Sequence, residues 1–148
     1  MSDINEAMIF AAGLGKRMYP LSTKVPKPLL KVNGKPIISY IIEDLINLNF
    51  KNIVINTHHL SERFHDELKP YSRTIKIVFE EEILDTGGGF LNAIKRNYFS
   101  NLKSPKVLIN GDVLWKKRTI SPVKNILRNW NEEKMDLLLC LIKKKLFF

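Results

Sequence analysis

Short apolar runs alternate along the chain with longer segments whose apolar residues recur at helical spacing. The apolar runs lack polar alternation and therefore predict buried strands, over residues 7–12, 52–57, 74–80, 106–110 and 136–142. The periodic segments predict helices over residues 37–49, 62–68, 89–98 and 122–130. Because strands and helices alternate throughout, we expect one α/β domain over residues 1–148, with a mainly parallel sheet and flanking helices. In such a sheet, ligands bind at the carboxyl ends of the strands.

The first predicted strand leads directly into residues 13–17, Gly-Leu-Gly-Lys-Arg. Two glycines let backbone N–H groups approach an anion where a Cβ would obstruct them. Lys27 follows between Pro26 and Pro28, which stiffen the segment that carries its ammonium group. These features indicate a polyphosphate site, although a glycine pair of this kind also occurs in ordinary strand-ending turns. The stretch is not a Walker loop and not the Rossmann fingerprint, because it has no G-K-[ST] and no third glycine.

Two further glycine-containing segments follow predicted strands. Asn110-Gly111-Asp112 places a carboxylate where it could hold Mg²⁺ against a triphosphate, but the same tripeptide is also good turn chemistry. Residues 84–89, Leu-Asp-Thr-Gly-Gly-Gly, come just before a predicted helix. Their glycines would allow a flat base to lie on the backbone, and a flexible loop is the alternative. Both segments fall at the strand ends, where the topology predicts ligands.

The chain is basic, with 24 Lys and Arg against 15 Asp and Glu, a formal charge of +9 and a pI near 9.7. The lysines are scattered rather than gathered in one arm or helix face, and the aromatic residues fall at core-like positions. We therefore do not expect a nucleic-acid partner, and we attribute the charge to polyphosphate affinity and a lysine-rich coding bias. The adjacent His58 and His59 point opposite ways in an extended segment, so they do not predict a shared metal site.

The single cysteine, Cys140, excludes an internal disulfide and lies in an apolar run, so we expect an inert core residue. The first residues do not resemble a signal peptide, and no apolar run is long enough to cross a membrane. These observations favour a cytoplasmic protein that does not associate with membranes. The sequence says nothing of its oligomeric state.

The pattern A-A-G-x-G-x-R-M-x-P-L-(x)-P-K-P over residues 11–28 resembles the signature of sugar-1-phosphate nucleotidylyltransferases. These enzymes join a nucleoside triphosphate to a sugar 1-phosphate and release pyrophosphate. Residues 57–60 (Thr-His-His-Leu), 84–89 and 110–115 (Asn-Gly-Asp-Val-Leu-Trp) look like those of N-acetylmuramate 1-phosphate uridylyltransferases. Close relatives of that group are often labelled mannose-1-phosphate guanylyltransferases. The resemblance implies a Rossmann-like nucleotide-diphospho-sugar transferase fold, with UTP as the expected donor.

The resemblance also implies roles for individual residues. Arg17 would contact the departing β- and γ-phosphates, Lys27 the α-phosphate, and Asp112 the Mg²⁺ cofactor. The nucleotide itself would be bound by Ala12, Gly13, Gly15, Lys16, Glu80, Asp85, Thr86, Gly87 and Asn110. At position 16 many family members carry threonine, so Lys16 is a departure from the pattern.

The family continues beyond this length with a sugar pocket and a second metal-binding aspartate, and the sequence shows no counterpart of either. The lysine run at residues 143–145 departs from family character where a further strand is due. We therefore expect a C-terminal part to be missing. Two hypotheses stay open: a working uridylyltransferase, completed by a partner or second fragment, and a truncated, non-catalytic nucleotide-binding remnant.

Overall fold

The computed structural model describes residues 4–115 and 121–141. The chain divides into two compact units, Met1–Leu114 and Trp115–Phe148. One domain over residues 1–148 stays a prediction. Within the described ranges, none of the helices has the length and apolar character needed to cross a membrane.

The first unit is built on a four-stranded parallel sheet in the order β5-β4-β1-β6. The strands are β1 Glu6–Phe10, β4 Asn52–Thr57, β5 Ile75–Phe79 and β6 Val107–Asn110. All four overlap predicted strands, although β1 begins one residue earlier and ends two residues earlier than the predicted 7–12. The predicted parallel sheet with flanking helices is confirmed. From β1 the chain adds β4 and then β5 on one side, and afterwards returns to place β6 on the other side of β1. The strand order therefore reverses between β1 and β6, the point where open α/β sheets bind ligands.

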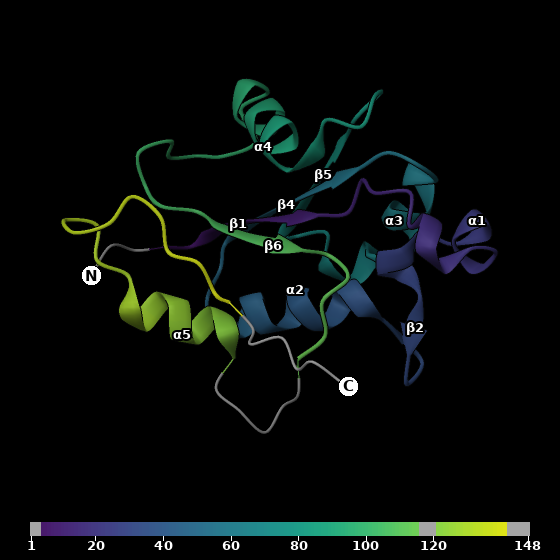
Figure 1. Cartoon of the computed structure of the whole chain (residues 1–148), viewed down its shortest axis with the longest axis horizontal. Coiled ribbons are helices and arrows are strands. Elements are labelled where there is room, and N and C mark those ends of the chain that lie inside the picture. The colour runs from purple at the N-terminus through teal and green to yellow at the C-terminus, as the bar shows by residue number, and fades with distance from the viewer. Residues whose placement is uncertain (1–3, 116–120, 142–148) are drawn as a thin grey trace, which may run out of the picture. The chain divides into compact units, whose positions relative to one another are not determined.

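Helices α2 (Ile37–Asn47) and α4 (Asp85–Lys95) cover opposite faces of this sheet (Figure 1). Side chains of a strand alternate between the two faces, so each face contributes its own core. Met8, Val54 and Val78 pack with Ala93 of α4 and with Phe99. The alternate strand residues face the side of α2. The buried apolar residues of this face include Ala7, Ile9, Ile53, Ile55, Ile75 and Val107 from the strands, and α2 contributes Ile38, Ile41, Ile42 and Leu45.

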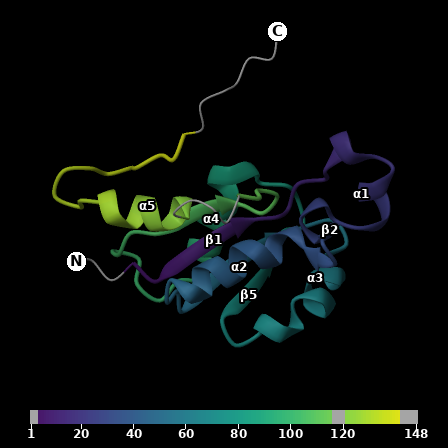
Figure 2. The same ribbon diagram turned by 90° about the horizontal axis from the view of Figure 1, so that it is seen from below.

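The remaining elements of the first unit are short. They are η1 Lys16–Met18, α1 Leu21–Lys24, η2 Lys27–Leu29, β2 Lys31–Val32, β3 Lys35–Pro36, α3 Ser61–Glu67 and η3 Lys69–Tyr71. Figures 1 and 2 both show α1 and β2 at the end of the sheet toward which β1 runs. The segment predicted to bind phosphates therefore lies at the carboxyl ends of the strands.

Helix α4 begins at Asp85 and ends at Lys95, so the prediction of a helix from residue 89 to residue 98 was wrong at both ends. The glycines at 87–89 lie in the first turns of the helix and do not form a loop before it. The space that a side chain would have differs between these glycines. A Cβ at Gly87 would meet nothing within 4 Å, whereas a Cβ at Gly89 would lie 2.7 Å from Glu80 Oε1 and 2.8 Å from Asn56 Nδ2. Gly88 also has a near neighbour, because a Cβ there would lie 3.0 Å from Leu84 Cβ. Close approach of another group therefore confines Gly88 and Gly89, but not Gly87.

The second unit contains α5, Pro122–Asn129, whose first turn is capped by Ser121 Oγ accepting from the Lys124 N–H. The predicted strand over residues 136–142 is wrong for residues 136–141, which form no regular element. A strand needs a neighbouring backbone to pair its N–H and C=O groups, and the described residues of this unit include no other strand. Leu137, Leu139 and Leu141 are accordingly exposed, and Cys140 is exposed rather than in a core, contrary to prediction. Ile142 and the lysine run at 143–145 lie outside the described residues.

Candidate functional site

A cavity of about 420 Å³ opens at the carboxyl ends of the four strands. One lining residue comes from the end of each strand. Phe10 and Asn110 are the last residues of β1 and β6, Asn56 is the last but one of β4, and Glu80 follows β5. Every residue predicted for the site lines the same cavity except Gly87. Segments that are up to 100 residues apart in the sequence, from Ala12 to Asp112, are thus brought to one place. Their roles in binding stay predictions.

The glycine turn after β1 is fixed by close packing at Gly15. This residue has φ of 63°, in the left-handed region that favours glycine. A Cβ there would lie 3.1 Å from Lys27 Cβ and 3.2 Å from Ser22 Cβ. The buried Ser22 hydroxyl donates to the Gly15 carbonyl oxygen at 2.8 Å and holds the turn. Gly15 therefore lets the loop and the Lys27 segment approach each other. Gly13 has no such neighbour, since a Cβ there would meet nothing within 4 Å.

Lys27 and Asp112 form a hydrogen-bonded ion pair, although 85 residues separate them in sequence. Their side chains are 26% and 34% exposed, so the pair lies at the cavity wall and within reach of solvent. Gly111 sets the position of Asp112. Its N–H donates to the Phe10 carbonyl oxygen at 2.8 Å, and a Cβ on it would lie 2.9 Å from that oxygen. The glycine thus allows the end of β6 to close tightly on the end of β1.

Asp112 is the residue predicted to hold Mg²⁺, and its surroundings limit how it could do so. No group of three or more His, Cys, Asp or Glu side chains suited to a metal occurs among residues 4–115 and 121–141. Mg²⁺ keeps several waters and is commonly held by one or two carboxylates together with substrate phosphates. The carboxylate of Asp112 at the cavity wall therefore fits a Mg²⁺ ion that arrives with a polyphosphate.

The opposite wall of the cavity carries a buried amide–carboxylate pair that the sequence did not reveal. Glu80 and Asn56 are each 2% exposed, and Asn56 Nδ2 donates to Glu80 Oε1 at 2.9 Å. Asn56 Oδ1 accepts from the Ala11 N–H at 2.9 Å, and Glu80 Oε2 accepts a long hydrogen bond of 3.4 Å from the Leu84 N–H. The sequence predicts Asn56 only as a residue of a buried strand and not as part of the site. The available signal was a lone amide near the end of the otherwise apolar run Asn-Ile-Val-Ile-Asn-Thr.

Asp85 and Thr86 complete this wall at the start of α4. Asp85 has φ of 55°, a left-handed conformation that is uncommon outside glycine. Ile83, Phe10 and Pro28 add apolar surface to the lining, and none of them was predicted. The cavity is thus lined by the cationic side chains of Lys16, Arg17 and Lys27, by apolar groups, and by the buried carboxylate of Glu80.

The model of the nucleotidyl transferase family matches residues 6–146. The N-acetylmuramate alpha-1-phosphate uridylyltransferase of Caulobacter vibrioides is 30% identical over 141 residues, covering 91% of this chain and 57% of that protein. The enzyme of the same name from Neisseria meningitidis serogroup B is 39% identical over 113 residues, covering 74% of this chain and 47% of that protein. Among solved structures, HddC from Yersinia pseudotuberculosis complexed with GMP-PN is 28% identical, with a TM-score of 0.61 over 74% of this chain and 48% of that one.

The chain therefore spans about half the length of the curated relatives it matches. The family that the motifs suggested is confirmed, and so is its fold. Uridylyltransferases occur among the relatives, and one structural neighbour holds a guanine nucleotide analogue.

Proposed function

The chain belongs to the nucleotidyl transferase family, and from this membership we propose that the protein transfers a nucleotidyl group from a nucleoside triphosphate, preferably UTP, to a sugar 1-phosphate. The observation that carries the proposal is the shared cavity at the strand-order reversal, which gathers the glycine turn, Lys27 and Asp112 on one side and Glu80 on the other. Because the chain spans about half of its relatives, the activity of the whole protein is part of the proposal.

The reaction needs no protein nucleophile. A phosphate oxygen of the acceptor attacks the α-phosphorus in line, and the bond from that phosphorus to the leaving pyrophosphate breaks. The protein positions the groups and neutralises charge. Arg17 and Lys27 both line the cavity. In the proposed reaction Arg17 would hold the β- and γ-phosphates, and Lys27 would meet the charge that grows on the α-phosphate. Mg²⁺, when held by Asp112 and the phosphates, would supply further charge neutralisation.

The Lys27–Asp112 ion pair is compatible with the proposed roles of its two residues, Lys27 toward the α-phosphate and Asp112 toward Mg²⁺. In the pair, each charge satisfies the other at a partly exposed site. A phosphate in the cavity offers Lys27 a second anionic partner, and the ammonium can turn toward it without being desolvated first. The proline-flanked segment and the contact between Gly15 and Lys27 keep the lysine backbone in place during this exchange.

The buried carboxylate favours certain bases. A carboxylate is an acceptor, so Glu80 matches a base edge with a ring N–H, as in uracil or guanine. Cytosine offers an acceptor at its ring N3 and a donor at its N4 amino group, so Glu80 fits cytosine only through the amino group. The Glu80 Oε2 atom retains acceptor capacity, because the bond from Leu84 is long. The resemblance of the motif at residues 84–89 to uridylyltransferases supports uracil as the preferred base. The structural neighbour complexed with GMP-PN makes guanine the alternative base to test.

The test combines nucleotide binding with turnover. Titration calorimetry with UTP, GTP, CTP and dTTP in the presence of Mg²⁺ measures binding, and pyrophosphate release with a panel of sugar 1-phosphates measures transfer. We expect saturable binding with UTP strongest and pyrophosphate release with at least one sugar. Arg17→Ala should weaken triphosphate binding, whereas Arg73→Ala, an exposed arginine outside the cavity, should not. No saturation by any nucleotide at millimolar concentration would refute the proposal, and binding without turnover would favour a non-catalytic nucleotide-binding protein.

A further inference from the structure

The amide of Asn56 joins three strands at the edge where the cavity lies. Asn56 belongs to β4, which lies between β1 and β5 in the sheet (Figure 1). Its oxygen accepts from the Ala11 N–H, just after β1, and its nitrogen donates to Glu80, just after β5. One side chain thus ties Ala11, two residues before the glycine turn, to the residue proposed to read the base.

Both contacts require the same orientation of the amide. A backbone N–H can only donate, so the Ala11 contact needs the amide oxygen, and the amide NH₂ is left for the carboxylate. Asn56 and Glu80 are also buried, at 2% exposed each. Loss of a hydrogen bond between buried groups is costly, because the groups it held must move or stay unsatisfied.

Helix α4 is packed directly onto this pair. Gly89 approaches so closely that a Cβ would lie 2.7 Å from Glu80 Oε1 and 2.8 Å from Asn56 Nδ2. Glu80 Oε2 reaches Leu84, the residue before the helix begins. The position of the helix start, with Asp85 and Thr86 on the cavity wall, therefore depends on where the pair lies.

We propose that Asn56 is a positioning residue of the nucleotide site, which sets the phosphate-binding turn and the base-reading wall at a fixed separation through its two hydrogen bonds. The inference rests on the proposed function, because it presumes that a nucleotide spans the cavity from the turn to Glu80. Asn56 itself carries no charge and takes no part in phosphoryl chemistry. Its loss should move the two walls independently of each other, and a ligand that touches both walls should register the change.

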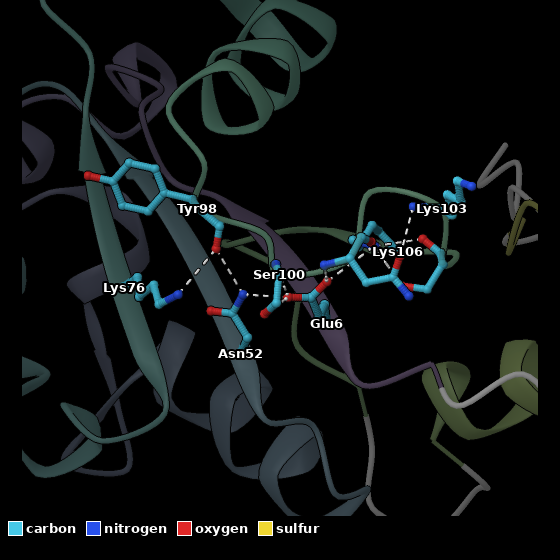
Figure 3. Close-up of polar contacts among 9 residues, drawn as sticks. Glu6, Asn52, Lys76, Tyr98, Ser100, Lys103 and Lys106 are labelled. Carbon is cyan, nitrogen blue, oxygen red and sulfur yellow. Dashed lines mark hydrogen bonds and ion pairs between the residues drawn. The ribbon is translucent and has the colours of Figure 1, made fainter.

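Asn52 offers a matched control in the same strand. It is also a buried asparagine of β4, and its Nδ2 donates to the Glu6 carboxylate at 2.7 Å and to the Tyr98 carbonyl oxygen at 2.9 Å (Figure 3). It lies at the amino end of the strand and does not line the cavity. Asn56→Ala and Asn52→Ala remove the same group from the same strand, so a purely structural role predicts the same consequences for both.

The experiment measures UTP affinity by calorimetry in the presence of Mg²⁺, and backbone protection by hydrogen–deuterium exchange without nucleotide. We expect Asn56→Ala to raise the Kd for UTP by roughly tenfold, the scale of one lost buried hydrogen bond. It should also lower the exchange protection of residues 11–15 and 84–89. Asn52→Ala should lower thermal stability yet leave the affinity and both segments unchanged. Equal effects of the two substitutions, or no effect of Asn56→Ala on either segment, would overturn the positioning role.

If Asn56→Ala does not fold, a second test exchanges the amide and the carboxylate between positions 56 and 80. Asn56→Asp keeps the acceptor for Ala11 but sets two carboxylates against each other, so it should lose protection in both segments. Adding Glu80→Gln restores a donor opposite that acceptor at unchanged total charge, and most of the protection should return. A double variant no better than Asn56→Asp would also overturn the proposal. If the wild-type protein bound no nucleotide, the proposed function itself would be refuted. If instead the wild type and both alanine variants bound UTP equally well, only the positioning role of Asn56 would be refuted.

Discussion

The two ends of the sheet each hold a buried carboxylate paired with an asparagine of β4, and they differ in how fully that carboxylate is satisfied. At the amino end, Glu6 accepts from Asn52 Nδ2, from the N–H and hydroxyl of Ser100 and from the Asn101 N–H, and it pairs with Lys106 Nζ at 3.2 Å (Figure 3). At the carboxyl end, Glu80 accepts one bond from Asn56 and a long one from Leu84. The described residues include no ion pair to Glu80.

This difference separates a stabilising network from a binding one. Burial penalises the charge of Glu6, but the hydrogen bonds of Ser100, Asn52 and Lys106 outweigh that penalty and lower its pKa from 4.5 to about 2. The network joins β1, β4 and the segment before β6, and each carboxylate oxygen of Glu6 has at least two donors, although the buried Asn52 Oδ1 has no hydrogen-bond partner among the described residues. Glu80, with fewer donors at the cavity wall, keeps acceptor capacity. The same pairing of amide and carboxylate thus serves stability at one end and leaves room for recognition at the other.

The largest effect is expected from Glu6→Gln. The substitution keeps the size of the side chain but leaves the Lys106 ammonium, with 7% of its side chain exposed, without its buried counter-charge. Breaking a buried pair in this way costs roughly 3–5 kcal/mol in the free energy of unfolding. Urea denaturation measures it, with Glu67→Gln as control, because its pair with Lys31 is partly exposed and worth at most about 1 kcal/mol. UTP affinity should not change in the folded variant. Equal losses of unfolding free energy in Glu6→Gln and Glu67→Gln would show that the Glu6 network is not a special source of stability.

Acid should remove the same stabilisation. The folded-state pKa of Glu6 lies below the unfolded value, so its contribution is complete above pH 4.5 and is lost as the pH falls toward 2. A lowering from 4.5 to about 2 corresponds to roughly 3 kcal/mol. Unfolding free energies of wild type and Glu6→Gln, measured from pH 6 to 2, should converge as the pH falls. A constant difference across that range would show that the carboxylate charge of Glu6 is not the source.

At the other end of the sheet, Lys27→Ala should damage catalysis more than stability. Lys27 is partly exposed, so little folding energy depends on it, but it faces the charge that develops on the α-phosphate in the proposed reaction. Loss of one preorganised electrostatic contact lowers kcat by roughly 100-fold or more, while nucleotide affinity should fall less. Lys27→Arg should not restore the rate, because a planar guanidinium does not replace a point charge in a proline-flanked segment.

The control for Lys27 is Lys24→Ala, an exposed lysine in α1 outside the cavity, with pyrophosphate release and urea denaturation measured for each variant. An unchanged kcat in Lys27→Ala would show that the prolines only shape a loop. A large loss of stability would place Lys27 in the same class as Lys106 and remove the contrast between the two ends.

The smallest effects should separate two glycines of α4. Gly89→Ala forces a Cβ against Glu80 and Asn56 and should cost about 1–3 kcal/mol through overpacking. Gly87→Ala meets nothing within 4 Å and should stabilise the helix by up to about 1 kcal/mol. Urea denaturation measures both. Weaker UTP binding by a stable Gly87→Ala variant would instead show that a base packs against that backbone, as the motif first suggested.

The sequence by itself determined the parallel α/β fold and nearly the whole candidate site. Apolar runs and helical spacing are local signals, and in a parallel sheet the residues that follow each strand must meet at one edge. For that reason Gly15, Lys27, Glu80 and Asp112 could be placed together without a structure. The family could be recognised because the turn after β1 requires particular residues in a fixed order.

Only the tertiary structure decided which of these residues touch. The Lys27–Asp112 pair spans 85 residues, and no local pattern specifies such a contact. Asn56 looked like one more strand residue, and its role depends on two neighbours that reach it from different strands. The reason for Gly89 lay in the same pair rather than in a ligand. The apolar run at 136–141 showed the converse, because strand propensity without a paired neighbour does not make a strand.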